Sequence, residues 1–145
     1  MDPKKLKFAD THEWAHAQGD IVSVGISDFA VHELHEITYV ELPPVGESTT
    51  QGEPFGEVES VKTVAELNAP CDGEVAEINE AVGDDPEILA TDPFGDGWLI
   101  RIKTNDADQL DDLMSHEQYK EFVQEEAEEQ AADAAAAGEA DQDEE

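Results

Sequence analysis

The sequence predicts a mainly β protein in which short strands pack as a sandwich, and two observations support this. First, runs rich in β-branched and apolar residues recur at short intervals, separated by Gly, Pro and Asp. Second, the tripeptide Gly-Glu-Val occurs twice, at 56–58 and 73–75, on either side of Lys62. Two similar strands that flank one residue are typical of a quasi-symmetric β-sandwich, and only short helices are expected beside them.

The first forty residues predict a hairpin followed by a short helix. The segment THEWAHAQGDIVSVGI has the composition of two strands joined by a turn at 18–20. Ser27 or Asp28 is expected to cap a helix within SDFAVHELHEI, where Val31 and Leu34 have helical spacing. The next segment, ITYVEL, predicts a further strand.

Residues 57–68 around Lys62 allow two interpretations. Val58, Val61 and Val64 fall near helical spacing, which favours one helix. The high β-branched content of the same segment favours two strands that meet near Lys62 and place it at the tip of a hairpin. The local pattern leaves both structures open.

The second half predicts two more strands and a final helix. EVAEIN and WLIRIK have strand composition, and a helical turn is expected near 86–89 between them. Ser115 and Gln118 have the spacing of a capping box at the start of the last helix. Tyr119 and Phe122 give that helix an apolar face.

Charge divides the chain into a body and a tail. The 145 residues include 38 Asp and Glu against 7 Lys and Arg, a formal net charge of -31. Residues 125–145 hold 10 of these acids and no base, and their alanine-rich composition has little to bury. We therefore expect one domain over residues 1–124 and a disordered acidic tail over 125–145.

The acidity also limits the partners and the environment. Binding to nucleic acid or to anionic membranes needs clustered cations, so neither is expected. Such a lysine-poor surface suits a cytoplasm of high salt, and we expect a halophilic source.

The start of the chain lacks an apolar signal core, and the single cysteine, Cys71, is expected to be a packed residue. His32 and His35 with Glu36 are not expected to bind a metal ion, because no further ligand is near in sequence.

Lys62 is an isolated cation in a long acidic segment of the chain. It is the only Lys or Arg between Phe8 and Ile100, a segment with 21 Asp and Glu. Neighbouring carboxylates raise the pKa of a lysine, whereas a catalytic amine needs a lowered pKa. Unless it is simply a solvated surface charge, Lys62 is therefore expected to be a point of covalent attachment rather than a catalyst.

The surrounding motifs add a resemblance. FGEVESVKTVAELNAPCDGEVAEIN resembles the lipoyl-attachment segment of the glycine cleavage system H-protein family. THEW, DIVSVGISDFA, VELPPVG, NEAVGDDPEIL and DPFGDGWLIRIK also resemble that family in order and spacing. The likeness covers residues 6–124.

This resemblance implies a hybrid β-barrel/sandwich of the lipoyl/biotinyl type, with the lipoyl part at about 21–103 and a C-terminal helix. It implies that Lys62 carries lipoate in amide linkage, attached by a lipoate ligase or lipoyl transferase. The family's members are non-catalytic carriers. They shuttle the aminomethyl group of glycine from glycine decarboxylase (P) to aminomethyltransferase (T), and dihydrolipoyl dehydrogenase (L) reoxidises the arm.

The resemblance also implies two pocket residues for the loaded arm. Glu13 matches the glutamate of the family's HEW motif, and Glu66 matches an acidic position four residues after the lysine. Glu33 stands where some members have a cleft histidine, and His35 replaces a common glycine. These two departures leave the details of the arm cleft open.

Three alternatives remain. A biotin carboxyl carrier shares the fold but usually flanks its lysine with methionines, whereas Val61 and Thr63 are the neighbours here. An enzyme could use Glu13 and Glu66 as an acid–base pair, although no partner motif accompanies them. An H-like protein could also donate lipoate to 2-oxoacid dehydrogenases.

Overall fold

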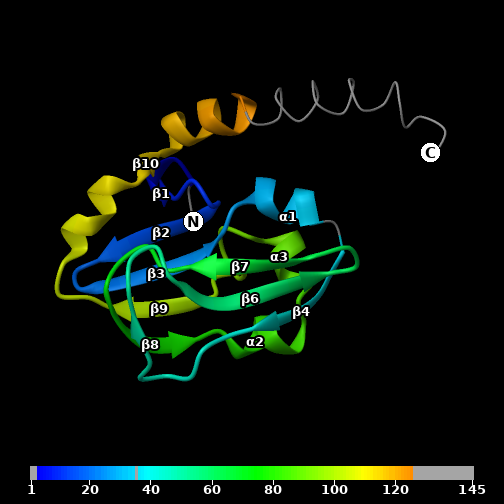
Figure 1. The fold of residues 1–145 in the computed structure, drawn as a ribbon, viewed down its shortest axis with the longest axis horizontal. Helices are drawn as coiled ribbons and strands as arrows, with labels where there is room; N and C mark the ends of the chain where they lie inside the picture. Colours follow the sequence, from blue (N-terminus) through cyan, green and yellow to red (C-terminus); the bar gives the residue numbers. More distant parts are fainter. Residues whose placement is uncertain (1–2, 35, 126–145) are drawn as a thin grey trace.

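The computed structural model describes residues 3–34 and 36–125, which fold into two antiparallel sheets with short helices around them (Figure 1). The predicted mainly β fold is confirmed, and the two sheets remain separate rather than closing into one barrel. The expected tail lies outside the described residues except for its first residue, Glu125, which is still helical.

The larger sheet has seven strands in the order β10-β1-β2-β3-β9-β8-β5. Its strands are β1 (Lys7–Phe8), β2 (Glu13–Gln18), β3 (Ile21–Ile26), β5 (Ser48–Thr49), β8 (Gly73–Ile78), β9 (Ile100–Lys103) and β10 (Met114–Ser115). The smaller sheet has the order β4-β6-β7. Its strands are β4 (Ile37–Glu41), β6 (Pro54–Ser60) and β7 (Val64–Asn68).

The helices are short, and they lie before, between or after the strands. They are η1 (Pro3–Lys5), α1 (Asp28–Leu34), α2 (Glu80–Asp84), α3 (Ile88–Thr91), η2 (Ala107–Asp112) and a C-terminal helix described over residues 116–125. The predicted helical turn near 86–89 is found slightly later, as α3. α2 was not predicted, although Asn79 caps it by accepting a hydrogen bond from the N–H of Ala81.

The hairpin of β2 and β3 forms as predicted. Gln18 pairs with Ile21 across a turn in which Gly19 has a φ of 65°, a conformation that glycine adopts without strain. Further along, Trp14 pairs with Gly25, and the indole ring lies where a Cβ of Gly25 would stand. The pairing therefore needs a glycine opposite the tryptophan.

The main core lies between the sheets. The larger sheet contributes β-branched residues of β3, β8 and β9, and the smaller sheet contributes one or two residues from each strand. The fully buried members include Val22, Val24, Val58, Leu67, Val75, Ile100 and Ile102. Burial of such side chains contributes about 1.5–3 kcal/mol each, which holds the two sheets together.

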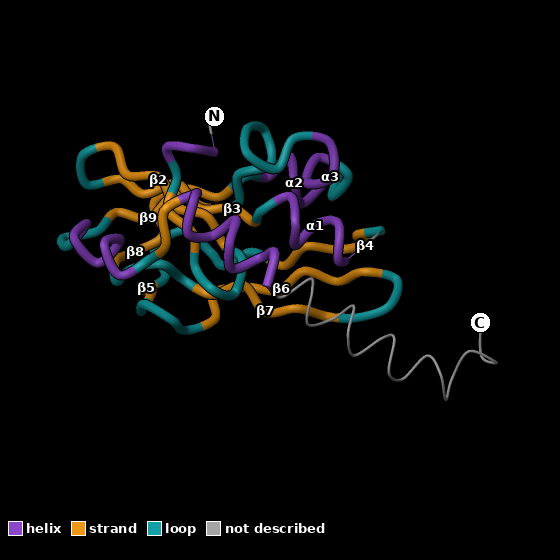
Figure 2. Tube along the Cα trace, turned by 90° about the horizontal axis from the view of Figure 1, so that it is seen from above, coloured by secondary structure: helices purple, strands orange, loops and turns teal. Residues whose placement is uncertain are grey.

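A second core joins the C-terminal helix to the start of the chain. Leu6, Phe8, Trp14 and Tyr119 are buried together, and the rings of Phe8 and Tyr119 stack at 4.4 Å. Seen from above, the helix lies across strands of the larger sheet (Figure 2). The predicted capping box is confirmed, because the Ser115 N–H donates to the side chain of Gln118 and the Gln118 N–H donates to Ser115 Oγ.

The two Gly-Glu-Val segments occupy matching places in the two sheets. A Cβ at Gly56 would collide with the carbonyl oxygen of Glu41 on β4, and one at Gly73 would collide with that of Lys103 on β9. Each glycine thus allows close approach of a neighbouring strand. The repeat that suggested a quasi-symmetric sandwich has this structural counterpart.

Candidate functional site

Lys62 lies in the turn of a β-hairpin. β6 and β7 pair antiparallel from Pro54 and Asn68 up to Glu59 and Val64, and residues 61–63 connect them. The helical alternative for 57–68 is therefore wrong, because the β-branched side chains pair across two strands. The hairpin tip extends beyond the rest of the smaller sheet (Figure 1).

Ser60 closes this turn in place of the usual Asn-Gly. Its N–H donates to the carbonyl of Thr63 at 2.8 Å. Its Oγ accepts from the N–H groups of Lys62 and Thr63 at 3.3 and 3.2 Å. A serine hydroxyl that accepts from amides two and three residues on is a known turn motif, so Ser60 is the sequence signal for this turn.

The ammonium of Lys62 has no fixed partner in the part of the chain that the structure describes. The side chain is exposed, and no hydrogen bond or ion pair holds it there. Its neighbours Val61 and Val64 are 63% and 53% exposed. An enzyme can therefore reach the amine without first breaking a contact.

Glu13, on β2, is only 1% exposed although it is an acid. Thr11 Oγ1 donates to its Oε1, and the N–H of Asn68 donates to its Oε2 at 2.8 Å. Burial raises the pKa of Glu13 to about 7, although these hydrogen bonds act in the opposite direction. The carboxyl thus joins the larger sheet to the end of β7 and is part-ionised near neutral pH.

Two clefts meet at the segment before Glu13. The smaller, of about 220 Å³, lies between Thr11, His12, α1 and Ala65 of β7, and Glu33 and Phe29 are among its lining residues. The larger, of about 550 Å³, lies between residues 8–11, the end of β7, residues 112–114 and Phe122 of the C-terminal helix. Thr11 lines both clefts and donates a hydrogen bond to the Glu13 carboxyl, whereas Glu13 itself lies behind Thr11 and lines neither cleft.

The structure does not bring Glu66 to Glu13. Glu66 pairs with Glu57, is exposed and lines neither cleft. Glu33, the position that departs from the family, does line the smaller cleft. His35 lies outside the described residues.

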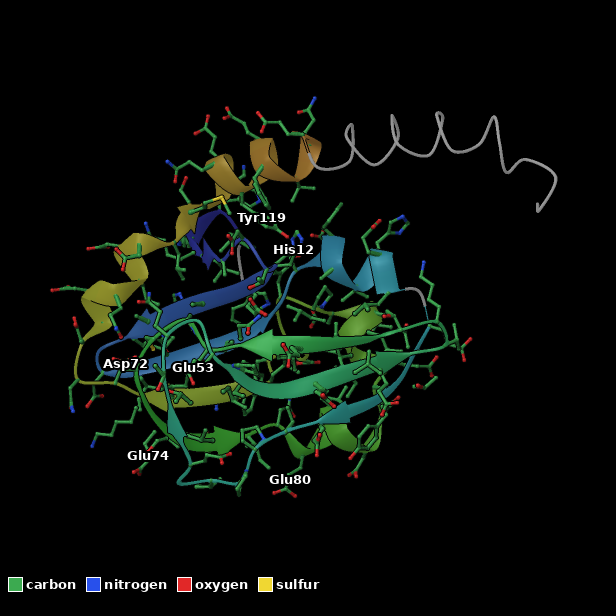
Figure 3. The ribbon with its side chains drawn as sticks, in the orientation of Figure 1. His12, Glu53, Asp72, Glu74, Glu80 and Tyr119 are labelled. Atoms are coloured by element: carbon green, nitrogen blue, oxygen red, sulfur yellow. The ribbon has the colours of Figure 1, made fainter. Side chains whose placement is uncertain are left out.

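Sequence reasoning missed the polar link that holds this corner. The hydroxyl of Tyr119 lies 2.7 Å from His12 Nδ1 and 2.6 Å from Ser27 Oγ, so it ties the C-terminal helix to the segment before Glu13 (Figure 3). His12 has a φ of 83°, a left-handed conformation that costs a non-glycine residue about 1 kcal/mol or more. The sequence contained His12 within THEW, but nothing local pointed to Tyr119.

The described residues show neither a reactive thiol nor a metal site. Cys71 is buried, and burial raises the pKa of its thiol to about 11, which disfavours the nucleophilic thiolate. Among the described residues, no group of three His, Cys, Asp or Glu side chains is placed to hold a metal ion. None of the described helices has the length and apolar character needed to cross a membrane.

The comparisons with known proteins agree with each other. The profile of the glycine cleavage H-protein family matches residues 6–126. A glycine cleavage system H protein of Prochlorococcus marinus is 54% identical over 121 residues, which cover 83% of this chain and 94% of the relative. One from Halalkalibacterium halodurans is 48% identical over 124 residues, covering 86% of this chain and 97% of the relative.

A solved structure extends this agreement to the fold. The crystal structure of a glycine cleavage system H protein from Mycobacterium marinum superposes with a TM-score of 0.75 at 37% identity, covering 87% of this chain and 99% of that one. Sequence and fold together identify the chain as a member of the glycine cleavage H-protein family.

Proposed function

We propose that this chain is the lipoyl carrier of a glycine cleavage system and that Lys62 carries lipoate in amide linkage. The observation that carries the proposal is the exposed Lys62 amine at the tip of the β6–β7 hairpin, with no fixed partner among the described residues. A covalent arm on such a tip can enter the active sites of several enzymes in turn. When attached, lipoate supplies a dithiolane that accepts a one-carbon amine unit and two electrons.

The chain's own residues offer a protected place beside the lysine. Ala65, three residues after Lys62 and about 10 Å along the strand, lines the smaller cleft. Thr11 connects this cleft to the larger one, next to the buried Glu13. A loaded arm lying there would be shielded from water by Phe29 and Phe122, which line the two clefts.

We propose that Glu13 holds the amine of the cargo. A carboxyl with a pKa near 7 is ready to ionise beside an ammonium group, and an ion pair in a buried place is stronger than one in water. We keep Glu66 as a second proposed residue of the arm pocket only because it lies four residues after Lys62. Its side chain is exposed, and this exposure does not support a role in a pocket.

The proposed partners are glycine decarboxylase (P), aminomethyltransferase (T), dihydrolipoyl dehydrogenase (L) and the lipoate ligase or lipoyl transferase that loads Lys62. We further propose that the carrier works in the cytoplasm of a halophile, where high salt screens its charge of -31. In this proposal residues 1–124 form the working domain and 125–145 a solvating tail.

Intact mass of the protein purified from its own host tests the proposal. We expect the mass increment of one lipoyl group on the natural chain and none on Lys62→Arg, which keeps the positive charge but removes the acylatable amine. A biotinyl increment would instead indicate a biotin carrier. An unmodified chain that supports glycine cleavage alone would overturn the proposal.

A further inference from the structure

A cavity of about 480 Å³ lies beneath the C-terminal helix, which is orange in Figure 1. β1, the start of α1 and Phe94 form its other walls. Phe8 lines both this cavity and the larger of the two clefts near Thr11, and Phe29 lines both this cavity and the smaller cleft. The volume lies in the range of about 300–1,000 Å³ that is typical of sites for small organic ligands.

The walls of this cavity are mainly aromatic and are held in place by contacts with each other. The apolar lining residues are Phe8, Phe29, Phe94, Tyr119 and Val123. The ring of Phe8 stacks on Tyr119 at 4.4 Å and meets the ring of Phe94 edge-on at 6.2 Å. A ligand that enters such a cavity needs little ordering of the side chains around it, which favours binding.

One end of the cavity has a cationic border, although the whole chain has only 7 Lys and Arg against 38 Asp and Glu. His116 and Lys120, one turn apart on the C-terminal helix, line the cavity and also an adjoining polar pocket of about 370 Å³, which Lys4 lines as well. Lys120 is exposed, and its ammonium forms no ion pair or hydrogen bond with the residues that the structure describes. Asp28 lines the cavity and Glu117 the polar pocket, but the wall that the two spaces share consists of His116 and Lys120. This end therefore suits a single negative charge.

We propose that this cavity binds a free medium-chain carboxylic acid, with the aliphatic chain between Phe8, Phe29 and Val123 and the carboxylate at Lys120. Charge alone would hold an inorganic anion only weakly at an exposed lysine, because salt screens the attraction. A polyanion or an acidic protein would be repelled by the net charge of -31, whereas a monocarboxylate adds one negative charge only. The apolar walls supply the rest of the affinity, since each buried methylene group tightens binding about fourfold.

The proposal does not depend on any modification of Lys62. Binding is non-covalent, and no group is transferred. A second copy of this chain is the competing occupant of an apolar cavity at the surface, and the measurements below distinguish it from a small acid.

Calorimetric titration of the full chain with sodium octanoate tests the site. We expect one saturable site per chain and an affinity about 15-fold above that for hexanoate, which is two methylene groups shorter. In amide NMR spectra, octanoate should shift the signals of Phe29, Phe94 and Val123 and leave that of Ala65, in the smaller cleft, in place. Lys62→Arg should bind octanoate as the natural chain does, so the result does not depend on the proposed carrier function.

Two variants test the charged and the apolar part of the cavity separately. Lys120→Gln should weaken octanoate binding about threefold to fivefold in dilute buffer and leave the binding of uncharged octanol unchanged. Lys103→Gln is the matched control, an exposed lysine on β9 that does not line the cavity, and should bind octanoate normally. Val123→Phe should reduce the affinity for octanoate at least tenfold, because the larger ring fills the cavity.

Three results would overturn the proposal. One is the absence of saturable octanoate binding to the natural chain. Another is an unchanged affinity for octanoate in both Lys120→Gln and Val123→Phe, with normal melting curves. The third is an affinity for octanoate that falls as the protein concentration rises, which would assign the cavity to a second copy of the chain.

Discussion

The N–H of Asn68 donates a hydrogen bond of 2.8 Å to the carboxyl of Glu13, 55 residues earlier in the chain. It joins the end of β7, in the smaller sheet, to β2 of the larger one. Glu13 is 1% exposed, and burial raises its pKa to about 7. The same group that we propose for cargo binding therefore also connects the hairpin of Lys62 to the rest of the fold.

This connection predicts a pH-dependent stability. The pKa of Glu13 is higher in the folded protein, about 7, than its ordinary value of 4.5, so the folded state binds the proton more tightly. Its contribution is fully present below about pH 4.5 and is lost as pH rises to about 7. Relative to Glu13→Gln, the free energy of unfolding of the natural chain should fall by up to about 3 kcal/mol across that window.

Glutamine suits this comparison because its amide can accept from the Asn68 N–H and donate to Thr11 Oγ1. Urea unfolding of both proteins from pH 4 to 8, at constant high salt, gives the difference directly. A carbon-13 titration of the Glu13 carboxyl should have a midpoint near 7. A difference that stays flat over this range would contradict the assignment.

Substitution by alanine is expected to change stability in opposite directions at two glycines, Gly25 and Gly83. A Cβ at Gly25 would stand 2.5 Å from the ring of Trp14, which is buried and donates a 2.9 Å hydrogen bond to the carbonyl of Pro93. Because that ring is held, Gly25→Ala should lower the free energy of unfolding by about 3 kcal/mol.

Gly83, in α2, is the matched position, with nothing within 4 Å of an added Cβ. Gly83→Ala should raise the free energy of unfolding by about 0.5–1 kcal/mol, because alanine favours the helix. Urea unfolding measures both variants. A Gly25→Ala variant as stable as the natural chain would show that Trp14 yields to the added methyl group.

Local sequence patterns predicted most strands and helices, whereas contacts between distant residues determine the geometry of the site. β-Branched composition and turn residues sufficed for β2, β3 and β8, even though β3 is buried on both faces and shows no alternation. Residues 57–68 stayed ambiguous because valines at helical spacing also suit a strand, and only pairing between β6 and β7 decides between them.

The environment of Glu13 was beyond sequence reasoning for a different reason. Its motif identified the residue, but its burial and its bond to Asn68 depend on how two distant sheets pack. Tyr119 was predicted only as an apolar residue of the last helix, whereas its hydroxyl also contacts His12 and Ser27. Such contacts join residues about a hundred positions apart, for which one sequence holds no local signal.

The hydroxyl of Tyr119 predicts a specific loss of stability. Tyr119→Phe keeps the stack on Phe8 but removes the contacts at 2.7 Å to His12 and 2.6 Å to Ser27. We expect the free energy of unfolding to fall by about 1–2 kcal/mol and amide exchange over residues 116–125 to accelerate.

Tyr39→Phe is the control for this change. Tyr39, on β4, is 50% exposed, so loss of its hydroxyl should change stability by less than about 0.5 kcal/mol. Amide exchange in the C-terminal helix should be unaffected by it. Equal exchange rates in natural chain and Tyr119→Phe would mean that the aromatic stack alone holds the helix.

Three glutamates that lie side by side across β4, β6 and β7 predict how salt acts on this protein. Glu57 lies opposite both Glu41 and Glu66, so removing its charge relieves two repulsions at once. Glu57→Gln should therefore raise the free energy of unfolding by about 0.5–1 kcal/mol in dilute buffer. In 2 M KCl the gain should vanish, because screening at 1 M salt already acts within about 3 Å.

Glu74→Gln is the contrasting variant, since Glu74 pairs with Lys103, and it should be slightly destabilising in dilute buffer. Thermal melts of the three proteins at both salt concentrations measure this, and a gain from Glu57→Gln that persists in 2 M KCl would attribute it to packing rather than to charge.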